Sequence, residues 1–74
     1  MRVGAAEEYL RKAGFRQIRV RIHGDIARLE VLPADFQRAI KHSAAITARL
    51  RKLGFVYVSL DLTGYRTGSM HEAA

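Results

Sequence analysis

The sequence contains no cysteine among its 74 residues. This absence excludes disulfides, thiolate metal ligands and a thiol nucleophile from the chain. There is also no apolar run near the roughly 18 residues that a membrane-spanning helix requires. Residues 1–8 lack the apolar core of a signal peptide. We therefore expect a cytoplasmic chain that has no membrane partner.

Acidic residues are scarce relative to basic ones. Thirteen Lys and Arg stand against seven Asp and Glu, which gives a formal net charge of +6. A small domain with this balance attracts phosphates, nucleic acid or an acidic protein surface. The same charge can also serve solubility alone. Composition does not decide between these interpretations, whereas the positions of the arginines can.

Hydrophobic residues make up 49% of the chain, enough for a packed core rather than disorder. The length suits one small domain, which we place at residues 1–74. Within it we expect an ordered core from about residue 6 to 62 and an irregular tail over residues 63–74. A core of this size gives only marginal stability by itself. Self-association or attachment to a neighbouring domain is therefore expected.

An internal repeat organises the chain. Residues 10–15 (LRKAGF) recur as residues 50–55 (LRKLGF), and each copy is preceded by apolar residues at helical spacing: Ala6, Leu10 and Ala13 in the first copy, and Ile46, Leu50 and Leu53 in the second. The glycine of each copy stands where a left-handed helix cap is needed, after a cationic last turn. The following phenylalanine is placed to fold back on the leucine. Each copy is therefore predicted to be a helix that ends at a glycine and leads into a strand.

After each phenylalanine the hydrophobic period changes to two, which is typical of half-buried strands. Inward positions are predicted at alternate residues, listed here in chain order: Ile18, Val20, Ile22, Ala27, Leu29, Val31, Val56, Val58, Leu60 and Leu62. A two-residue hairpin turn at residues 23–24, with positive φ at Gly24, pairs Val20 with Ala27 and Ile18 with Leu29. The second strand is expected over residues 25–32.

Pro33 opens the next helix at its first turn. Phe36 and Ile40 are its expected apolar anchors, and Ser43 is a candidate cap for a fresh helix. Residues 33–53 can form one helix or two, with a break at residues 42–43. The predicted architecture is an α+β, two-layer domain of order α-β-β-α-β, with a three-stranded sheet and helices on one face.

The opposite sheet face is predicted to be polar and rich in arginine. The alternation places these residues on it: Gln17, Arg19, Arg21, Arg28, Glu30, Tyr57, Ser59 and Asp61. Arg19 and Arg21 lie roughly 7 Å apart along the strand, which suits two guanidinium groups converging on one phosphate or carboxylate. Ordinary cross-strand pairing of a solvated face explains the same pattern. No RNP-type aromatic pattern accompanies it, so the pattern indicates nucleic acid only weakly.

Other chemistry receives little support. The three histidines, His23, His42 and His71, lack metal-ligand spacing, so no metal site is expected. No serine has a neighbouring His and acid that would make it a nucleophile. No phosphate-binding lysine loop and no dinucleotide glycine fingerprint is present. We therefore expect no catalytic residue in this chain.

Two stretches carry a family resemblance. Residues 14–31 (GFRQIRVRIHGDIARLEV) and residues 53–70, which end in GYRTGSM, resemble the C-terminal part of the ATP-dependent sacrificial sulfur transferases. This family belongs to the PP-loop ATP pyrophosphatase superfamily and acts in making the nickel-pincer cofactor of lactate racemase. The resemblance extends from about residue 6 to residue 72.

The resemblance implies a set of partners and roles. In the family, an N-terminal PP-loop ATPase domain uses ATP and Mg to activate a nicotinate-derived carboxylate, and the C-terminal part lends charged residues to a site at a subunit interface of a higher oligomer. Arg19 and Arg21 match paired arginines that hold substrate phosphate. Glu30 matches an acidic residue beside them, and Glu7 matches another through a weaker motif. Arg28 is a further candidate from its place on the same face.

The departures from the family limit what the chain does alone. It lacks the pyrophosphate loop and the sulfur-donating cysteine, so it is not expected to be an enzyme by itself and needs no cofactor of its own. It matches either an excised domain or a short protein that keeps only this module. The leading hypothesis is a non-catalytic C-terminal domain that supplies an oligomerisation surface and arginine contacts to a phosphate-bearing small molecule. The alternatives are a stand-alone basic nucleic-acid-binding module and a purely structural domain.

Overall fold

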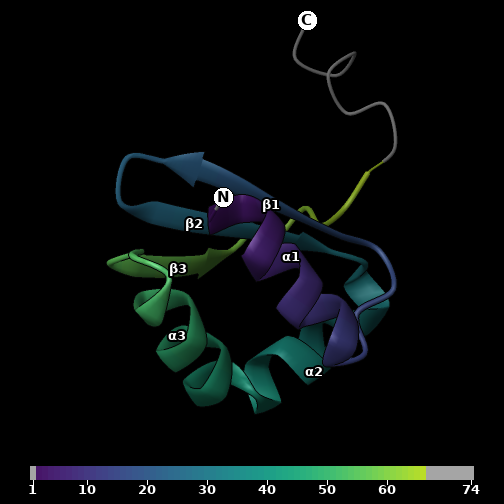
Figure 1. Ribbon diagram of the computed structural model, residues 1–74. Coiled ribbons are helices and arrows are strands. Elements are labelled where there is room, and N and C mark those ends of the chain that lie inside the picture. Colours follow the sequence, from purple (N-terminus) through teal and green to yellow (C-terminus); the bar gives the residue numbers. More distant parts are fainter. Residues whose placement is uncertain (1, 67–74) are drawn as a thin grey trace, which may run out of the picture.

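The computed structural model describes residues 2–66 of the chain. A three-stranded sheet forms one layer, and helices gather on one side of it (Figure 1). The elements follow in the order α1 (Arg2–Lys12), β1 (Ile18–His23), β2 (Ile26–Val31), the short 3₁₀ helix η1 (Pro33–Asp35), α2 (Phe36–Lys41), α3 (Ser43–Lys52) and β3 (Tyr57–Leu60). The α+β architecture predicted from the hydrophobic pattern is confirmed.

The sheet is mixed, with β2 in its centre. The strand order is β1-β2-β3; β1 pairs antiparallel with β2, and β3 pairs parallel with β2. A parallel neighbour cannot follow through a tight turn, so the chain crosses over through η1, α2 and α3 before it adds β3. This crossover places its helices on the same side of the sheet as α1 (Figure 1).

The hairpin between β1 and β2 differs from the predicted one by a single turn position. The turn residues are Gly24 and Asp25, so Val20 pairs with Leu29 and Ile22 with Ala27. The pairings predicted for a turn at residues 23–24 are wrong. Gly24 has φ +57°, and no described non-glycine residue has positive φ, so φ is negative at Asp25. A positive φ at the first turn position only is the pattern of a type II′ turn. The shift of two residues in register preserves the face of every side chain.

Both copies of the repeat form the same helix end. Gly14 and Gly54 have φ +109° and +106°. In each copy the phenylalanine N–H donates to the carbonyl of the leucine five residues before it, Phe15 to Leu10 at 3.1 Å and Phe55 to Leu50 at 3.2 Å. The glycine N–H donates to the carbonyl three residues before it, which completes a Schellman motif. The predicted left-handed caps are therefore confirmed.

After the short η1, the region between β2 and β3 contains two α-helices, which resolves the alternative left open by the sequence. Pro33 begins η1 as expected, and the break between α2 and α3 lies at His42 (φ −103°, ψ 19°). His42, not Ser43, occupies the cap position of α3, and it makes no side-chain cap bond. Ile40 is 57% exposed, so the anchor predicted there is wrong; Ala39 is buried instead. Adjacent residues of an α-helix point about 100° apart, so the face of α2 that buries Ala39 leaves Ile40 at the surface.

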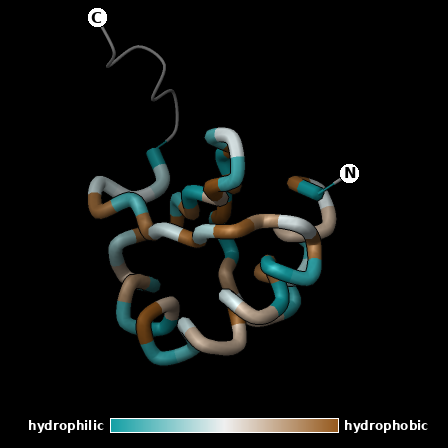
Figure 2. Tube along the Cα trace, turned by 90° about the vertical axis from the view of Figure 1, so that its left-hand side faces the viewer, coloured by the Kyte–Doolittle hydropathy of each residue, from teal (hydrophilic) through white to brown (hydrophobic). Residues whose placement is uncertain are grey.

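The core lies between the sheet and the helices. Hydrophobic and hydrophilic residues are interleaved along the trace (Figure 2). The buried apolar side chains are Ala6, Leu10, Phe15, Ile18, Val20, Ala27, Leu29, Val31, Ala39, Ile46, Leu50 and Phe55. Four predicted inward residues are largely outside this core: Ala13 is exposed, Ile22 is 40% exposed, Val56 is 46% exposed and Leu62 is 81% exposed. Because β3 has only four residues, Val56 and Leu62 lie beyond its ends and lose the strand alternation.

Residues 63–66 contain no helix or strand, yet they pack against the sheet. Gly64 is buried, and the Tyr65 N–H donates to the Val31 carbonyl at 2.8 Å. The remainder of the predicted tail, with the Gly-Ser-Met ending and His71, lies outside the described residues.

Candidate functional site

Four charged residues form a connected cluster on the open sheet face: Arg21, Arg28, Glu30 and Asp61. Arg21 and Arg28 are direct partners across β1 and β2, a placement that repels when two like charges have nothing between them. Glu30 removes this repulsion. Its Oε2 accepts from Arg21 Nε at 3.4 Å and from Arg28 Nη2 at 3.3 Å.

Glu30 is the buried member of this charged cluster, with 7% of its surface exposed. A buried carboxylate is tolerated when cationic partners surround it. Both arginine side chains remain more exposed, at 39% for Arg21 and 38% for Arg28. Arg28 Nε also lies 3.5 Å from Asp61 Oδ2, which follows directly after β3. β1, β2 and the residue after β3 thus contribute to one network, in which Glu30 holds two guanidinium groups at the surface.

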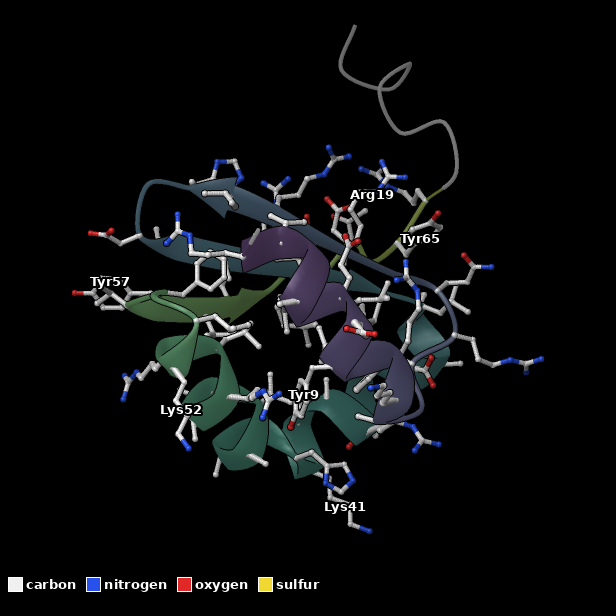
Figure 3. The ribbon with its side chains drawn as sticks, viewed as in Figure 1. Tyr9, Arg19, Lys41, Lys52, Tyr57 and Tyr65 are labelled. Carbon is white, nitrogen blue, oxygen red and sulfur yellow. The ribbon has the colours of Figure 1, made fainter. Side chains whose placement is uncertain are left out.

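Arg19 is directly opposite Glu30 in the strand register, yet its contact is aromatic. The guanidinium carbon lies 5.5 Å from the centre of the Tyr65 ring, within the range of a cation–π contact. The two side chains approach each other beside the segment after β3 (Figure 3). A guanidinium that stacks through its flat face keeps its N–H edge available for a ligand. Tyr65 therefore orients Arg19 without consuming its donors.

Glu7 lies apart from the charged cluster. Its Oε2 accepts a hydrogen bond from the Val20 backbone N–H at 3.0 Å, and its Oε1 lies 3.8 Å from Arg11. Backbone groups of successive residues in β1 point alternately toward β2 and away from it. The Val20 N–H is one of those that point away, toward the outer edge of the sheet. Glu7 thus ties α1 to the outer edge of β1. The structure brings Arg21, Arg28 and Glu30 together, places Arg19 beside them, and assigns Glu7 a contact at the sheet edge.

Two participants were not singled out as site residues from the sequence. Strand alternation had placed Asp61 on the arginine-rich face. The presence of Arg28 on the same face could have indicated an ion pair between the two residues. Tyr65 lies beyond the last predicted strand, where alternation gives no information. Its position depends on the bond to Val31, a contact between distant residues that no local pattern encodes.

The pKa of Asp61 is held below its ordinary value of 3.8, chiefly because the Thr63 N–H donates to its carboxylate, at 2.9 Å, with Arg28 adding attraction. Since the folded-state pKa is lower than the unfolded one, ionised Asp61 stabilises the fold above its ordinary pKa. This stabilisation is lost as the pH falls through the folded-state pKa. We expect Asp61→Asn to be less stable than the parent at neutral pH and to lose stability less steeply on acidification. Urea unfolding at a series of pH values measures both.

The matched control for this experiment is Asp25→Asn, which removes the same formal charge from the exposed hairpin turn. It is expected to retain the acid dependence of the parent. Parallel pH curves for Asp61→Asn and the parent would contradict the role assigned to Asp61.

Neither a metal nor a membrane is indicated by the described part of the chain. Residues 2–66 contain no group of three His, Asp or Glu side chains that could hold a metal ion. Over the same residues, no helix is both long and apolar enough to cross a membrane. The charged cluster is therefore the feature of the described surface with the most defined chemistry.

Comparison with known proteins relates the chain to one part of larger proteins. No protein-family model matches it. Over 70 residues it is 46% identical to the pyridinium-3,5-bisthiocarboxylic acid mononucleotide synthase of Lactiplantibacillus plantarum, covering 95% of this chain and 25% of that protein. It is 39% identical over 72 residues to an uncharacterized protein of Synechocystis, covering 95% of this chain and 27% of that protein.

The chain thus spans about a quarter of the length of the curated relatives it matches. The resemblance seen in the sequence is supported to this extent: the chain is similar to a segment of a protein that is named as a mononucleotide synthase.

Proposed function

We propose that the chain acts as a non-catalytic domain of a sulfur-transferase-like PP-loop protein and contributes arginine contacts to a phosphate-bearing substrate. The observation that carries this proposal is the arrangement of Arg21 and Arg28 on the buried carboxylate of Glu30. A carboxylate that holds two guanidinium groups limits their motion before any ligand arrives, and this lowers the ordering cost of binding.

The donors that remain define the ligand class. Glu30 engages Arg21 through Nε, so this contact does not use the two terminal nitrogens of Arg21. Arg19, stacked on Tyr65, adds a second set of donors on the same strand face, two residues away. Two guanidinium edges at this spacing suit a phosphate group better than a single carboxylate, because phosphate offers more acceptor oxygens. The relative in L. plantarum is named for a mononucleotide, which carries such a group.

The chemistry of the reaction is proposed to belong to the remainder of the larger protein. The present sequence has no pyrophosphate loop and no cysteine. Binding of ATP and Mg, and the transfer of sulfur, are therefore assigned to an N-terminal PP-loop domain. Within this proposal, the role of the present chain is to position the phosphate of the substrate and to provide surface for assembly.

The test is titration of the chain with inorganic phosphate, nicotinate mononucleotide and ATP, followed by amide chemical shifts. We expect shifts centred on β1 and on Tyr65 with the mononucleotide. The double variant Arg19→Ala/Arg21→Ala should bind about tenfold more weakly or worse, since each lost charged hydrogen bond contributes about 1.5–3 kcal/mol. Circular dichroism checks that the variant remains folded.

The matched control is Arg16→Ala/Arg38→Ala, which removes the same charge from exposed positions outside the sheet. It should change affinity by no more than about twofold, the size of effect expected from long-range charge alone. Equal weakening by both double variants would show that the ligand responds to the overall positive charge of the domain and not to a defined site. Tighter, salt-sensitive binding of mixed oligonucleotides would favour the nucleic-acid alternative instead.

A further inference from the structure

The two edge strands of the sheet, β1 and β3, differ in whether another element contacts their outer backbone groups. At the β1 edge, α1 packs alongside the strand, and Glu7 accepts the outward Val20 N–H. At the other edge, β3 is the outer strand of the sheet. The Tyr57 N–H donates to the carbonyl of Asp25, just before β2, at 3.1 Å, and the Asp61 N–H donates to the carbonyl of Leu29 in β2 at 2.9 Å. The residues of opposite parity, Val58 and Leu60, therefore direct their backbone groups away from the sheet.

Within residues 2–66, the β3 edge lacks the devices that normally protect an exposed strand. Charged side chains, proline and bulges are the usual means of preventing edge-to-edge pairing. The sequence of β3, Tyr-Val-Ser-Leu, contains none of these. In a chain with thirteen Lys and Arg, an uncharged outer strand is a notable exception.

An apolar hollow of about 110 Å³ lies beside this edge, between β3 and the α2–α3 pair. All of its lining residues are uncharged, and they include Ala39, Ile40, Ile46, Val58 and Leu60. Ile40 is 57% exposed at its rim. An open strand and an adjacent apolar hollow together offer backbone hydrogen bonds and apolar contact to the same partner.

We propose that the partner is a second copy of this chain, paired antiparallel through β3 about a two-fold axis at Ser59. In this register Val58 of one copy faces Leu60 of the other, and each such pair exchanges both of its backbone hydrogen bonds. The two sheets become one, and the two hollows meet on the helical side. The interface is isologous and closes on itself, as most homodimer interfaces do.

Charge favours this antiparallel arrangement. Arg51 and Lys52 end α3 just before β3 begins, whereas Asp61 follows directly after β3. Antiparallel pairing brings the cationic start of one strand beside the anionic end of the other. A parallel arrangement would place like charges together. The dimer also sets the charged clusters of both copies on one continuous face.

A site-specific cross-link tests the axis. Opposed Ser59 residues form a non-hydrogen-bonded pair, with Cα atoms about 4.5 Å apart, which lies within the disulfide range of about 4.4–6.8 Å. Since the chain has no cysteine, Ser59→Cys introduces its sole thiol. Mild oxidation should give a covalent dimer rapidly. The control Gln17→Cys, exposed and outside β3, should cross-link far more slowly.

Sedimentation velocity over a range of concentrations tests the association itself. The parent chain should show a monomer–dimer equilibrium, and Ser59→Lys should weaken it roughly tenfold or more by opposing two cations at the axis. Gln17→Lys adds the same charge elsewhere and should leave association within about twofold. A parent chain that remains monomeric throughout, or equal cross-linking at positions 59 and 17, overturns the proposal and assigns the edge to a segment of a longer chain. The dimer names the partner for the assembly surface of the proposed function. Neither result affects phosphate binding, so failure of the dimer and failure of the phosphate contacts are distinguishable.

Discussion

Replacing Phe55 with alanine is expected to leave the domain largely unfolded at 25 °C. Phe55 lies between α3 and β3 and is 2% exposed. The guanidinium carbon of Arg2 lies over its ring, 4.6 Å from the ring centre. Removing a buried phenylalanine costs about 3–5 kcal/mol. A single core of this size supplies about the same amount in total. Loss of the far-UV circular dichroism signal and of a cooperative urea transition is the expected result.

Phe15→Ala provides an internal replicate, because Phe15 occupies the equivalent corner of the first repeat and is 1% exposed. We expect the two variants to be similarly destabilised. The control is Val56→Ala, one residue after Phe55 but 46% exposed, which should change stability by about 0.5–1 kcal/mol. A Phe55→Ala chain with the urea midpoint of the parent would contradict the packing described here.

Replacing Gly64 with alanine is expected to produce the second large loss. Gly64 has φ +86°, and a Cβ added there would lie 2.9 Å from the Val31 carbonyl oxygen and 3.2 Å from Pro33 Cδ. The Val31 carbonyl is the acceptor of the Tyr65 N–H. Backbone strain and the displaced hydrogen bond together should cost about 2–4 kcal/mol. Equilibrium unfolding in urea measures the loss.

Gly24→Ala separates the two causes. Gly24 also has positive φ, +57°, but an added Cβ would have no atom within 4 Å. This variant should lose only the conformational part, about 1 kcal/mol. Equal losses at the two positions would show that the close approach of Gly64 to Val31 contributes nothing. A substantial loss at Gly64 should also reduce mononucleotide binding, since Tyr65 would no longer orient Arg19.

Features encoded by neighbouring residues were predictable from the sequence. The helix corners at Gly14 and Gly54 follow from a local pattern of leucine, cations, glycine and phenylalanine, and the structure confirms both. The faces of the strands were also predicted, because alternation fixes a face even when the turn position is wrong by one residue. The hairpin register failed for the same reason: a change of two residues leaves the buried set unaltered, so the hydrophobic pattern does not distinguish the two pairings.

Features that depend on where an element stops were less predictable. Val56 and Leu62 continue the alternation of β3 in the sequence, yet the strand ends before reaching either of them. Ile40 has the helical spacing of a core residue, but α2 buries the adjacent Ala39 instead. In each case, packing between distant segments decides the outcome, and periodicity within one segment carries no information about it.

In the candidate site, too, some features were predictable from local sequence and others depend on contacts between distant segments. Alternation placed Arg19, Arg21, Arg28 and Glu30 on one face, and the structure does so too. The near-complete burial of Glu30 was not predicted, because it results from two arginines on different strands approaching one oxygen. Glu7 was grouped with these residues by resemblance to a family. Its observed contact with the Val20 N–H was not accessible from a helical pattern alone.

The direction of the strands has a consequence for the electric field of the domain. Since β1 is antiparallel to β2 and β3 is parallel to it, the two helix–strand units are related by an approximate dyad through β2, and α1 and α3 run in opposite senses (Figure 1). Their macrodipoles therefore largely cancel, and the cations in their last turns lie at opposite ends of the molecule. An anion approaching the domain meets a diffuse positive potential rather than one focused at a helix end. Discrimination between anions must consequently come from short-range contacts, and the strand arginines are the groups arranged to make them.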